Sequence, residues 1–156
     1  QSQDLIDEMR EVAWRVYPTA LDEHGLRPVL ERIAGRSPVP LTLVTVPEGR
    51  FPPAAESATY FVVREAVTNV VKHAEATAIT VSIVVEAQTT LTVTISDDGL
   101  GGADPRGGGL QGLARRVGAL DGSLDIDSAE GTGTTVSARI PLGAEAQMGS
   151  TKSEKS

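Results

Sequence analysis

The chain has 156 residues, a formal net charge of −7, and 40% hydrophobic residues with only 3% aromatic residues. This length predicts one domain with flanking segments, and the acidic balance argues against nucleic acid as a partner, since a nucleic-acid backbone favours a basic surface. The absence of Cys excludes a disulfide framework and thiolate metal sites. No apolar run approaches the roughly 18 residues of a membrane span, and no signal peptide is present. We therefore expect this segment to be cytoplasmic, while a membrane anchor elsewhere in a parent protein stays open.

The first elements are predicted to be helical. Apolar residues at spacings of three and four predict a helix over 2–17, which Pro18 stops. Its apolar stripe predicts packing against a partner outside this segment or, alternatively, against its own domain. A turn is predicted over 22–26, followed by a short helix over 28–34 with a proline in its first turn. Because the sequence begins at Gln1 rather than Met, we expect a longer parent protein.

The middle of the chain is predicted to hold three strands and one long helix. Residues 41–46 alternate in polarity and predict a strand, and a loop over 47–53 follows. The long helix is predicted over 54–75. Two strands rich in Val, Ile and Thr, 79–86 and 91–96, form a predicted hairpin.

The last third of the chain is rich in glycine. Residues 102–109 predict a mobile loop, and a helix over 110–120 follows. Strands are predicted over 124–128 and 134–140, and the polar residues 143–156 predict a flexible tail. The whole order predicts an α+β fold, a two-layer sandwich in which about three helices cover a mixed, mostly antiparallel sheet of about five strands.

The stretch 64–74 gathers four polar groups on one side of the predicted long helix. At about 100° per residue, Glu65, Asn69, Lys72 and His73 share one arc. Amide and carboxylate oxygens suit hydrated Mg²⁺, and a Lys ammonium suits phosphate. A surface helix with ordinary polar residues is the alternative. The apolar residues that fall on the opposite side and predict a core stripe are Tyr60, Val63, Val67, Val70, Val71 and Ala74.

A short acidic and glycine-rich motif directly follows the second strand of the hairpin. Asp97 is an acceptor that suits an exocyclic amine such as that of adenine. Gly99 and Gly101 permit a positive φ and a close approach of the backbone to a flat ring. A simple Asp-Gly turn is the alternative, and Asp98 is interpreted as a solvated or capping residue.

Two further glycine motifs follow. Residues 107–110 open a helix, where exposed N–H groups and the helix dipole suit phosphate, although a flexible linker is the alternative. Residues 131–134 precede the last strand. The Thr134 hydroxyl would reach adenine directly or through water, or the motif forms only a hairpin turn.

In order and spacing together, these motifs resemble the ATP-binding catalytic domain of sensor histidine kinases of the NarL/DesK type. That domain belongs to the Bergerat-fold superfamily, with gyrase B, Hsp90 and MutL. Residues 64–74 are similar to its N box, 97–101 to its G1 box, 107–113 to its G2 box and 133–134 to its last Gly-Thr motif. Residues 16–26 resemble the junction after the second dimerisation helix of the subfamily.

The resemblance implies a division of the chain, cofactors and partners. Residues 1–20 would end a dimerisation helix and linker, 21–142 would form the ATP-binding domain, and 143–156 would be a tail. The implied cofactors are ATP and Mg²⁺. The implied partners are a dimerisation domain that carries the phosphoacceptor His and a response-regulator receiver domain. The segment alone is expected to be a monomer and its parent a dimer.

The resemblance also implies roles for individual residues. Glu65 would be a catalytic carboxylate that polarises the attacking nucleophile, and Asn69 would ligate Mg²⁺. Gly107, Gly109 and Leu110 would form the hinge and base of a lid over ATP. The residues implied to bind the nucleotide are Asn69, Lys72, His73, Asp97, Gly99, Gly101, Gly107, Gly109, Leu110 and Thr134.

The two histidines limit what this segment is expected to do. Neither His24 nor His73 stands in the acidic and basic context of the family's phosphoacceptor. We therefore expect ATP·Mg binding without autophosphorylation by this segment alone. Two alternatives remain: a degenerate module that senses nucleotide without transfer, and a Bergerat-fold ATPase in which Glu65 activates water.

Overall fold

The computed structural model describes most of the chain between Leu21 and Leu142. The predicted helix over 2–17, most of the predicted glycine loop and the tail over 143–156 lie outside the described residues, as do the side chains of His73 and Ala74. The described residues are 21, 24–101, 108–129 and 131–142.

The described elements follow the predicted order. Each strand lies within one residue of its predicted bounds, because alternating Val, Ile and Leu mark strands strongly. The elements are the helix α3 (Leu26–Arg36), strand β1 (Leu41–Thr45), helix α4 (Pro53–Asn69), π-helix η1 (Val70–Ala74), strands β2 (Ile79–Glu86) and β3 (Thr90–Asp97), helix α5 (Gly108–Gly118), and strands β4 (Ser123–Asp127) and β5 (Thr135–Pro141).

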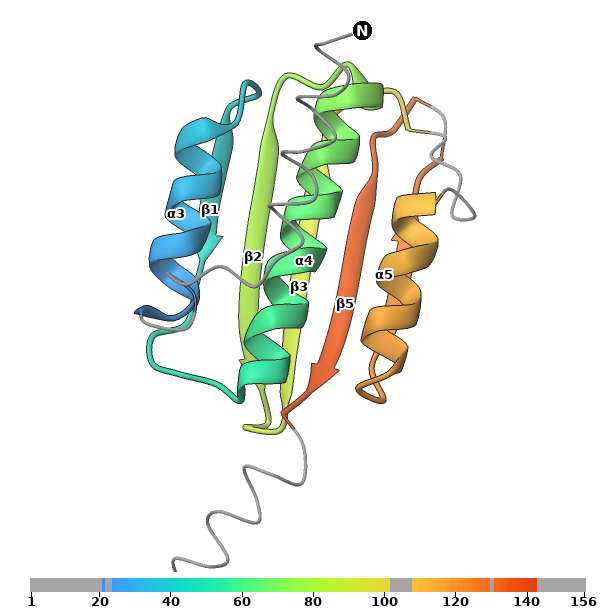
Figure 1. Ribbon diagram of the computed structural model, residues 1–156. Coiled ribbons are helices and arrows are strands. Elements are labelled where there is room, and N and C mark those ends of the chain that lie inside the picture. The colour runs from blue at the N-terminus through green and yellow to red at the C-terminus, as the bar shows by residue number, and fades with distance from the viewer. Residues whose placement is uncertain (1–20, 22–23, 102–107, 130, 143–156) are drawn as a thin grey trace, which may run out of the picture.

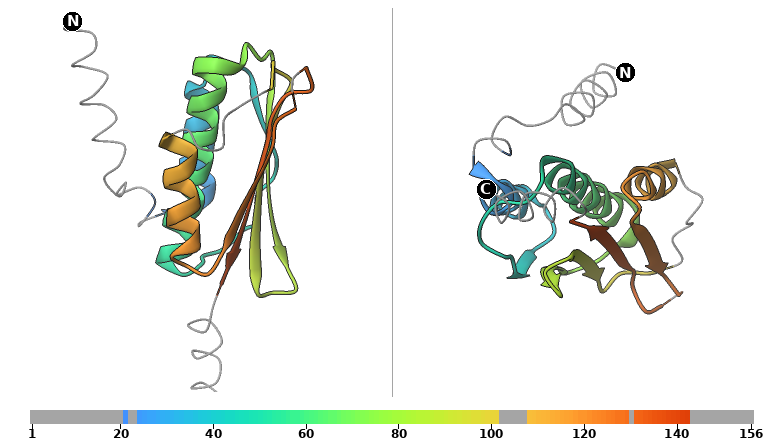
Figure 2. Two further views of the ribbon diagram at one scale, coloured as in Figure 1. Left: turned by 90° about the vertical axis from the view of Figure 1, so that its right-hand side faces the viewer. Right: turned by 90° about the horizontal axis from the view of Figure 1, so that it is seen from below.

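The five strands form one sheet in the order β1-β2-β3-β5-β4. β1 runs parallel to β2, and the other neighbouring pairs are antiparallel. Helices α3, α4 and α5 lie side by side on one face of this sheet, as Figure 1 and the turned views of Figure 2 show. The predicted two-layer α+β sandwich with a mixed, mostly antiparallel sheet is therefore confirmed.

The core lies between the sheet and the helices. The inward positions of the three central strands are almost wholly buried, and α4 lies above them with its middle residues buried. Burial raises the pKa of Tyr60 on α4 to about 12, against the opposing effect of the Arg64 guanidinium, so the phenol stays neutral. The inward strand residues are Ile79, Val81, Ile83, Leu91, Val93, Ile95, Val136, Ala138 and Ile140.

Helices α3 and α5 differ from the prediction at their ends. α3 begins at Leu26, whose side chain is buried, and His24 is helical, so among the described residues of the predicted turn only Gly25 lies outside a helix. Gly25 makes the break, because its φ of 84° suits glycine. α5 ends at Gly118 rather than at residue 120, because the chain tightens there into a turn. A Cβ at Gly122 in this turn would lie 2.4 Å from the Arg139 carbonyl oxygen.

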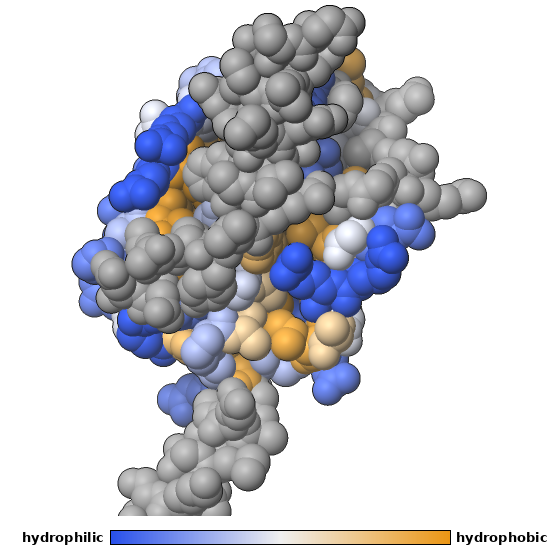
Figure 3. Space-filling model, in the orientation of Figure 1, coloured by the Kyte–Doolittle hydropathy of each residue, from blue (hydrophilic) through white to orange (hydrophobic). Residues whose placement is uncertain are grey.

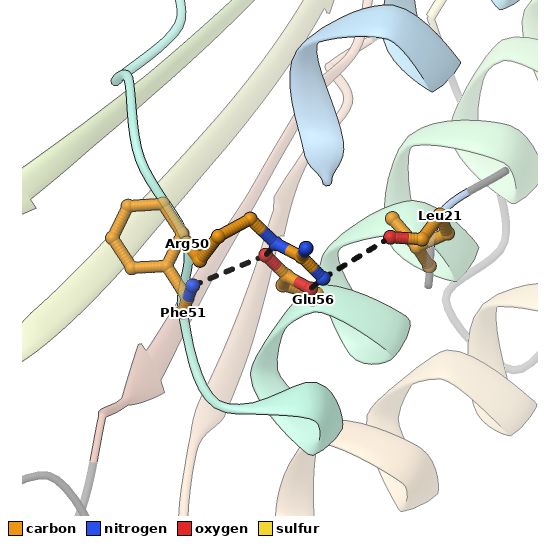
Figure 4. A network of polar contacts seen from close by, with 4 residues as sticks. All are labelled: Leu21, Arg50, Phe51 and Glu56. Atoms are coloured by element: carbon orange, nitrogen blue, oxygen red, sulfur yellow. Dashed lines mark hydrogen bonds and ion pairs between the residues drawn. The ribbon is translucent and has the colours of Figure 1, made fainter. Parts of the chain in front are cut away.

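An ion pair between a half-exposed Arg50 and a buried Glu56 fixes the start of α4 (Figure 4). The Glu56 carboxylate is 0% exposed and accepts hydrogen bonds of 3.0 Å from both Arg50 Nε and Arg50 Nη2. It also accepts the Phe51 N–H at 3.1 Å, and Arg50 Nη2 reaches the Leu21 carbonyl oxygen at 3.4 Å. Three separate stretches of the chain are thereby joined, and the sequence pattern gives no sign of this network.

Candidate functional site

The described elements that carry the predicted site residues begin or end at one end of the molecule. α4 ends at Asn69, β3 ends at Asp97 and α5 begins at Gly108, all at the upper end in Figure 1. The register of β3 and β5 pairs Ser96 with Thr135, so the start of the last strand lies beside Asp97. The fold thus brings three motifs that are far apart in sequence to a common end of the sheet.

Asp97 is held in a defined orientation at the end of β3. Its Oδ1 accepts the Gly99 N–H at 2.7 Å, and its own backbone N–H donates to the Thr134 carbonyl oxygen at 2.9 Å. In the described part of the chain, no hydrogen bond engages the second carboxylate oxygen. The arrangement presents a partly buried acceptor of fixed direction, as the recognition of a flat base by its amine requires.

Two glycines of these motifs are required by close backbone packing. Gly101 and Gly133 have φ of 72° and 79°. A Cβ at Gly101 would lie 2.1 Å from the Ala129 carbonyl oxygen, and one at Gly133 would lie 2.1 Å from the Asp97 carbonyl oxygen. The segment after β3 and the turn before β5 therefore press on each other with no room for a side chain. The positive φ expected for Gly101 is observed, and an added Cβ there would meet this turn.

The other predicted residues of this end divide between surface and core. Thr134 Oγ1 lies 2.5 Å from Ser128 Oγ, a partner that the sequence did not indicate. Leu110 lies on α5, and its side chain is buried in the core. Gly109 is the second residue of that helix, whereas Gly107 lies outside the described residues.

The predicted long helix over 54–75 is wrong in its last turn. The α-helix ends at Asn69 and continues as the π-helix η1, after which Glu75 is left-handed with φ of 49°. A π-turn holds more residues than an α-turn, so the 100° spacing fails beyond Asn69. Val71, predicted to lie in the core, is 40% exposed, whereas Val70 remains buried. Such π-segments are frequent at functional sites.

The polar side of this helix carries Glu65 and Asn69 one turn apart, both partly exposed. Glu65 lies beside Arg64, with 3.9 Å between Oε1 and Nη1. Lys72 follows on η1 and is exposed. The backbone of His73 belongs to η1, but its side chain is outside the description. A carboxylate, an amide and an ammonium thus follow one another up to the end that also holds Asp97.

Asp98 makes a set of contacts that sequence reasoning missed. Its Oδ1 accepts the backbone N–H groups of Thr77 at 2.8 Å and of Ala78 at 3.0 Å, and its Oδ2 accepts the Thr77 hydroxyl. These bonds hold the pKa of the Asp98 carboxyl below its usual range, and the bond from the Thr77 hydroxyl contributes most. The side chain is exposed as predicted, but it ties the end of β3 to the segment that follows η1.

A groove lies at the other end of the helical layer. It runs between the first turns of α4 and the last turns of α5, and Arg116 in its wall stacks 4.1 Å above the Phe61 ring. Figure 3 shows hydrophobic residues beside strongly hydrophilic ones at this lower end. The groove is remote from Asn69 and Asp97, so it does not belong to the predicted site. Its lining residues are Ala54, Ser57, Ala58, Gly112, Arg115, Arg116, Ala119 and Leu120.

Comparison with known proteins identifies relatives of the chain. Residues 54–144, more than half of the chain, match the family described as histidine kinase-, DNA gyrase B-, and HSP90-like ATPase. The chain is 30% identical over 148 residues to the oxygen sensor histidine kinase NreB of Staphylococcus carnosus, covering 88% of this chain and 42% of that protein. It is 33% identical over 147 residues to the signal transduction histidine-protein kinase/phosphatase DegS of Brevibacillus brevis, covering 88% of this chain and 38% of that protein.

A solved structure shares the same fold. The histidine kinase domain of the blue-light activated histidine kinase of Erythrobacter litoralis aligns with a TM-score of 0.61 and 26% identity, over 74% of this chain and 57% of that one. The chain spans less than half the length of the curated relatives described above. Among the described helices, none has the length and apolar character to cross a membrane.

Proposed function

Because the chain belongs to the family of histidine kinase-, DNA gyrase B- and HSP90-like ATPases, we propose that it is the ATP-binding catalytic domain of a sensor histidine kinase. It binds ATP with Mg²⁺ and donates the γ-phosphoryl group to a His on a dimerisation domain of the parent protein. A receiver domain of a response regulator then takes the group. In this proposal, residues 1–20 are the end of the dimerisation helix and the linker, and residues 21–142 form the catalytic domain.

The observation that carries the proposal is the common position of Asn69 and Asp97 at the upper end of the fold. Asp97 accepts a hydrogen bond from the exocyclic amine of adenine through the oxygen that Gly99 does not engage. Guanine carries a carbonyl oxygen at the equivalent ring position, and two acceptors repel each other. This geometry therefore favours ATP over GTP.

The residues at the end of α4 suit the triphosphate and its metal. Mg²⁺ takes one or two protein ligands and keeps much of its water, and the Asn69 amide oxygen would supply one such ligand. When bound, the ion would neutralise phosphate charge. Lys72 and His73 approach the phosphates, and Glu65, one turn before Asn69, polarises the incoming imidazole.

The adenine assignment is tested by replacing Asp97. Asp97→Asn replaces a charged acceptor and should weaken ATP binding by about 1.5–3 kcal/mol, measured by isothermal titration. Asp125→Asn, at an exposed position on β4, makes the same change of charge and should leave the affinity unaltered. ATP affinity that is the same in the Asp97 variant, with GTP still excluded, would refute the assignment.

Transfer is tested by supplying the missing substrate. The chain is mixed with radiolabelled ATP and a separate dimerisation domain that contains a phosphoacceptor His. Label on that His, with little phosphate released in its absence, supports a kinase. Steady hydrolysis of ATP by the chain alone, without transfer, would instead assign it as an ATPase in which Glu65 activates water.

A further inference from the structure

We infer that Asp98 is a positioning residue of the nucleotide site, which fixes the phosphate-side segment of the chain relative to the adenine-side Asp97. The inference rests on the proposed function, because it concerns how the two halves of that site are held together. Asp98 acts through its hydrogen bonds to other parts of the chain, and it does not need to touch the nucleotide.

The contacts of Asp98 join parts of the chain that are 20 and 21 residues apart. One carboxylate oxygen accepts the N–H groups of both Thr77 and Ala78, and the other accepts the Thr77 hydroxyl. Ile79 follows immediately and pairs with Asp97 in the sheet. Asp98 therefore continues the contact between β2 and β3 beyond their last paired residues, Ile79 and Asp97. Without it, the N–H groups of Thr77 and Ala78 would have water as their partner.

The segment that Asp98 holds is the one that carries Lys72 and His73. Between Asn69 and Thr77 the chain passes through a π-helix and a left-handed Glu75. Both conformations are less favourable than an uninterrupted helix and persist where the surroundings fix the chain on both sides. α4 fixes one side of this segment, and Asp98 fixes the other. The carboxylate thus sets where the phosphate-side residues stand with respect to its sequence neighbour Asp97.

The geometry separates a role in positioning from a role of charge. In Asp98→Asn, the remaining carbonyl oxygen still accepts both N–H groups, and the new amide donates to the Thr77 oxygen. In Asp98→Ala, all three bonds are lost. A positioning residue is therefore rescued by Asn, whereas a residue that acts through its charge is not.

The experiment compares adenosine with ATP·Mg as ligands in titrations of the full chain. Asp98→Ala should leave the affinity for adenosine within about twofold and reduce the preference for ATP·Mg over adenosine by about tenfold, since only the phosphate side is displaced. Asp98→Asn should restore most of that preference. Asp127→Ala, an exposed carboxylate at the end of β4, is the control for charge at this end and should change neither affinity.

Three outcomes overturn the inference. If Asp98→Ala loses adenosine and ATP·Mg affinity equally, Asp98 belongs to the adenine pocket. If Asp98→Asn does not restore the preference for ATP·Mg, Asp98 acts through its charge. If Asp98→Ala leaves the preference unchanged, Asp98 has no role in the site. If the Ala variant does not fold, as judged by thermal unfolding without nucleotide, Thr77→Val removes one of the three bonds and should reduce the preference by about threefold. A wild-type chain that binds neither ligand would instead refute the proposed function.

Discussion

Two carboxylates in opposite surroundings hold the start of α4 and the segment that follows η1. At the lower end, Glu56 is fully buried and bonds to Arg50 and Phe51, while at the upper end the exposed Asp98 bonds to the segment after η1. A buried charge that loses its partner gains less water in its place than an exposed charge does. The lower network should therefore determine stability, and the upper one should determine position with a smaller effect on stability.

The largest effect is expected from breaking the lower network. Arg50→Ala leaves the Glu56 carboxylate buried and without its guanidinium. Because Arg50 itself is 49% exposed, water partly replaces it, so we expect the free energy of unfolding to fall by about 2–4 kcal/mol. Urea denaturation measures this loss. ATP affinity of the folded fraction should stay unchanged, because the network lies at the end of α4 away from Asn69.

The control for that prediction is an exposed ion pair in the sheet. Arg139 lies 3.9 Å from Glu86, and both side chains are more than half exposed. Arg139→Thr keeps a residue that suits a strand and should cost no more than about 1 kcal/mol. Equal losses in the two variants would show that burial does not distinguish the two kinds of carboxylate contact.

A second effect is expected at the upper end from two glycines in one turn. Gly133 and Gly131 have φ of 79° and 81°, but only Gly133 lies against the backbone of Asp97. Gly131→Ala should cost about 1 kcal/mol for its conformation alone. Gly133→Ala adds the clash with the Asp97 carbonyl oxygen and should cost at least about 2 kcal/mol. Thermal unfolding compares the two, and ATP titration should show weaker binding only for Gly133→Ala. Equal behaviour of both variants would remove packing as the reason for glycine at 133.

Some features of the fold and of the candidate site could be predicted from the sequence. The runs of Val, Ile and Thr in β2 and β3 predicted strands, because β-branched residues fit a pleated, half-buried surface. The order of the motifs predicted that Asn69 and Asp97 would share a site, and the structure places both at one end.

The contacts of Glu56 and Asp98 could not be predicted in the same way. The helical periodicity around Glu56 does not reveal its partner. That partner, Arg50, lies in a loop whose sequence has no helical or strand period. Asp98 depends on backbone N–H groups, which every residue offers, so sequence gives no sign of which ones it accepts. The π-helix was missed for a related reason, since an interruption of the 100° repeat leaves the composition unchanged.

The smallest effect is expected where that interruption changes which valine is buried. A continuous α-helix would place Val70 and Val71 together in the core stripe, but in the structure Val70 is 6% exposed and Val71 is 40% exposed. Val70→Ala should therefore lower the free energy of unfolding by about 1–2.5 kcal/mol through lost burial. Val71→Ala should stay within about 0.5 kcal/mol of the unchanged protein, because the helix propensity of Ala offsets the little contact area lost. Equal losses in urea denaturation would mean that the helix runs on without a π-turn, and the segment that Asp98 holds would then be an ordinary helix end.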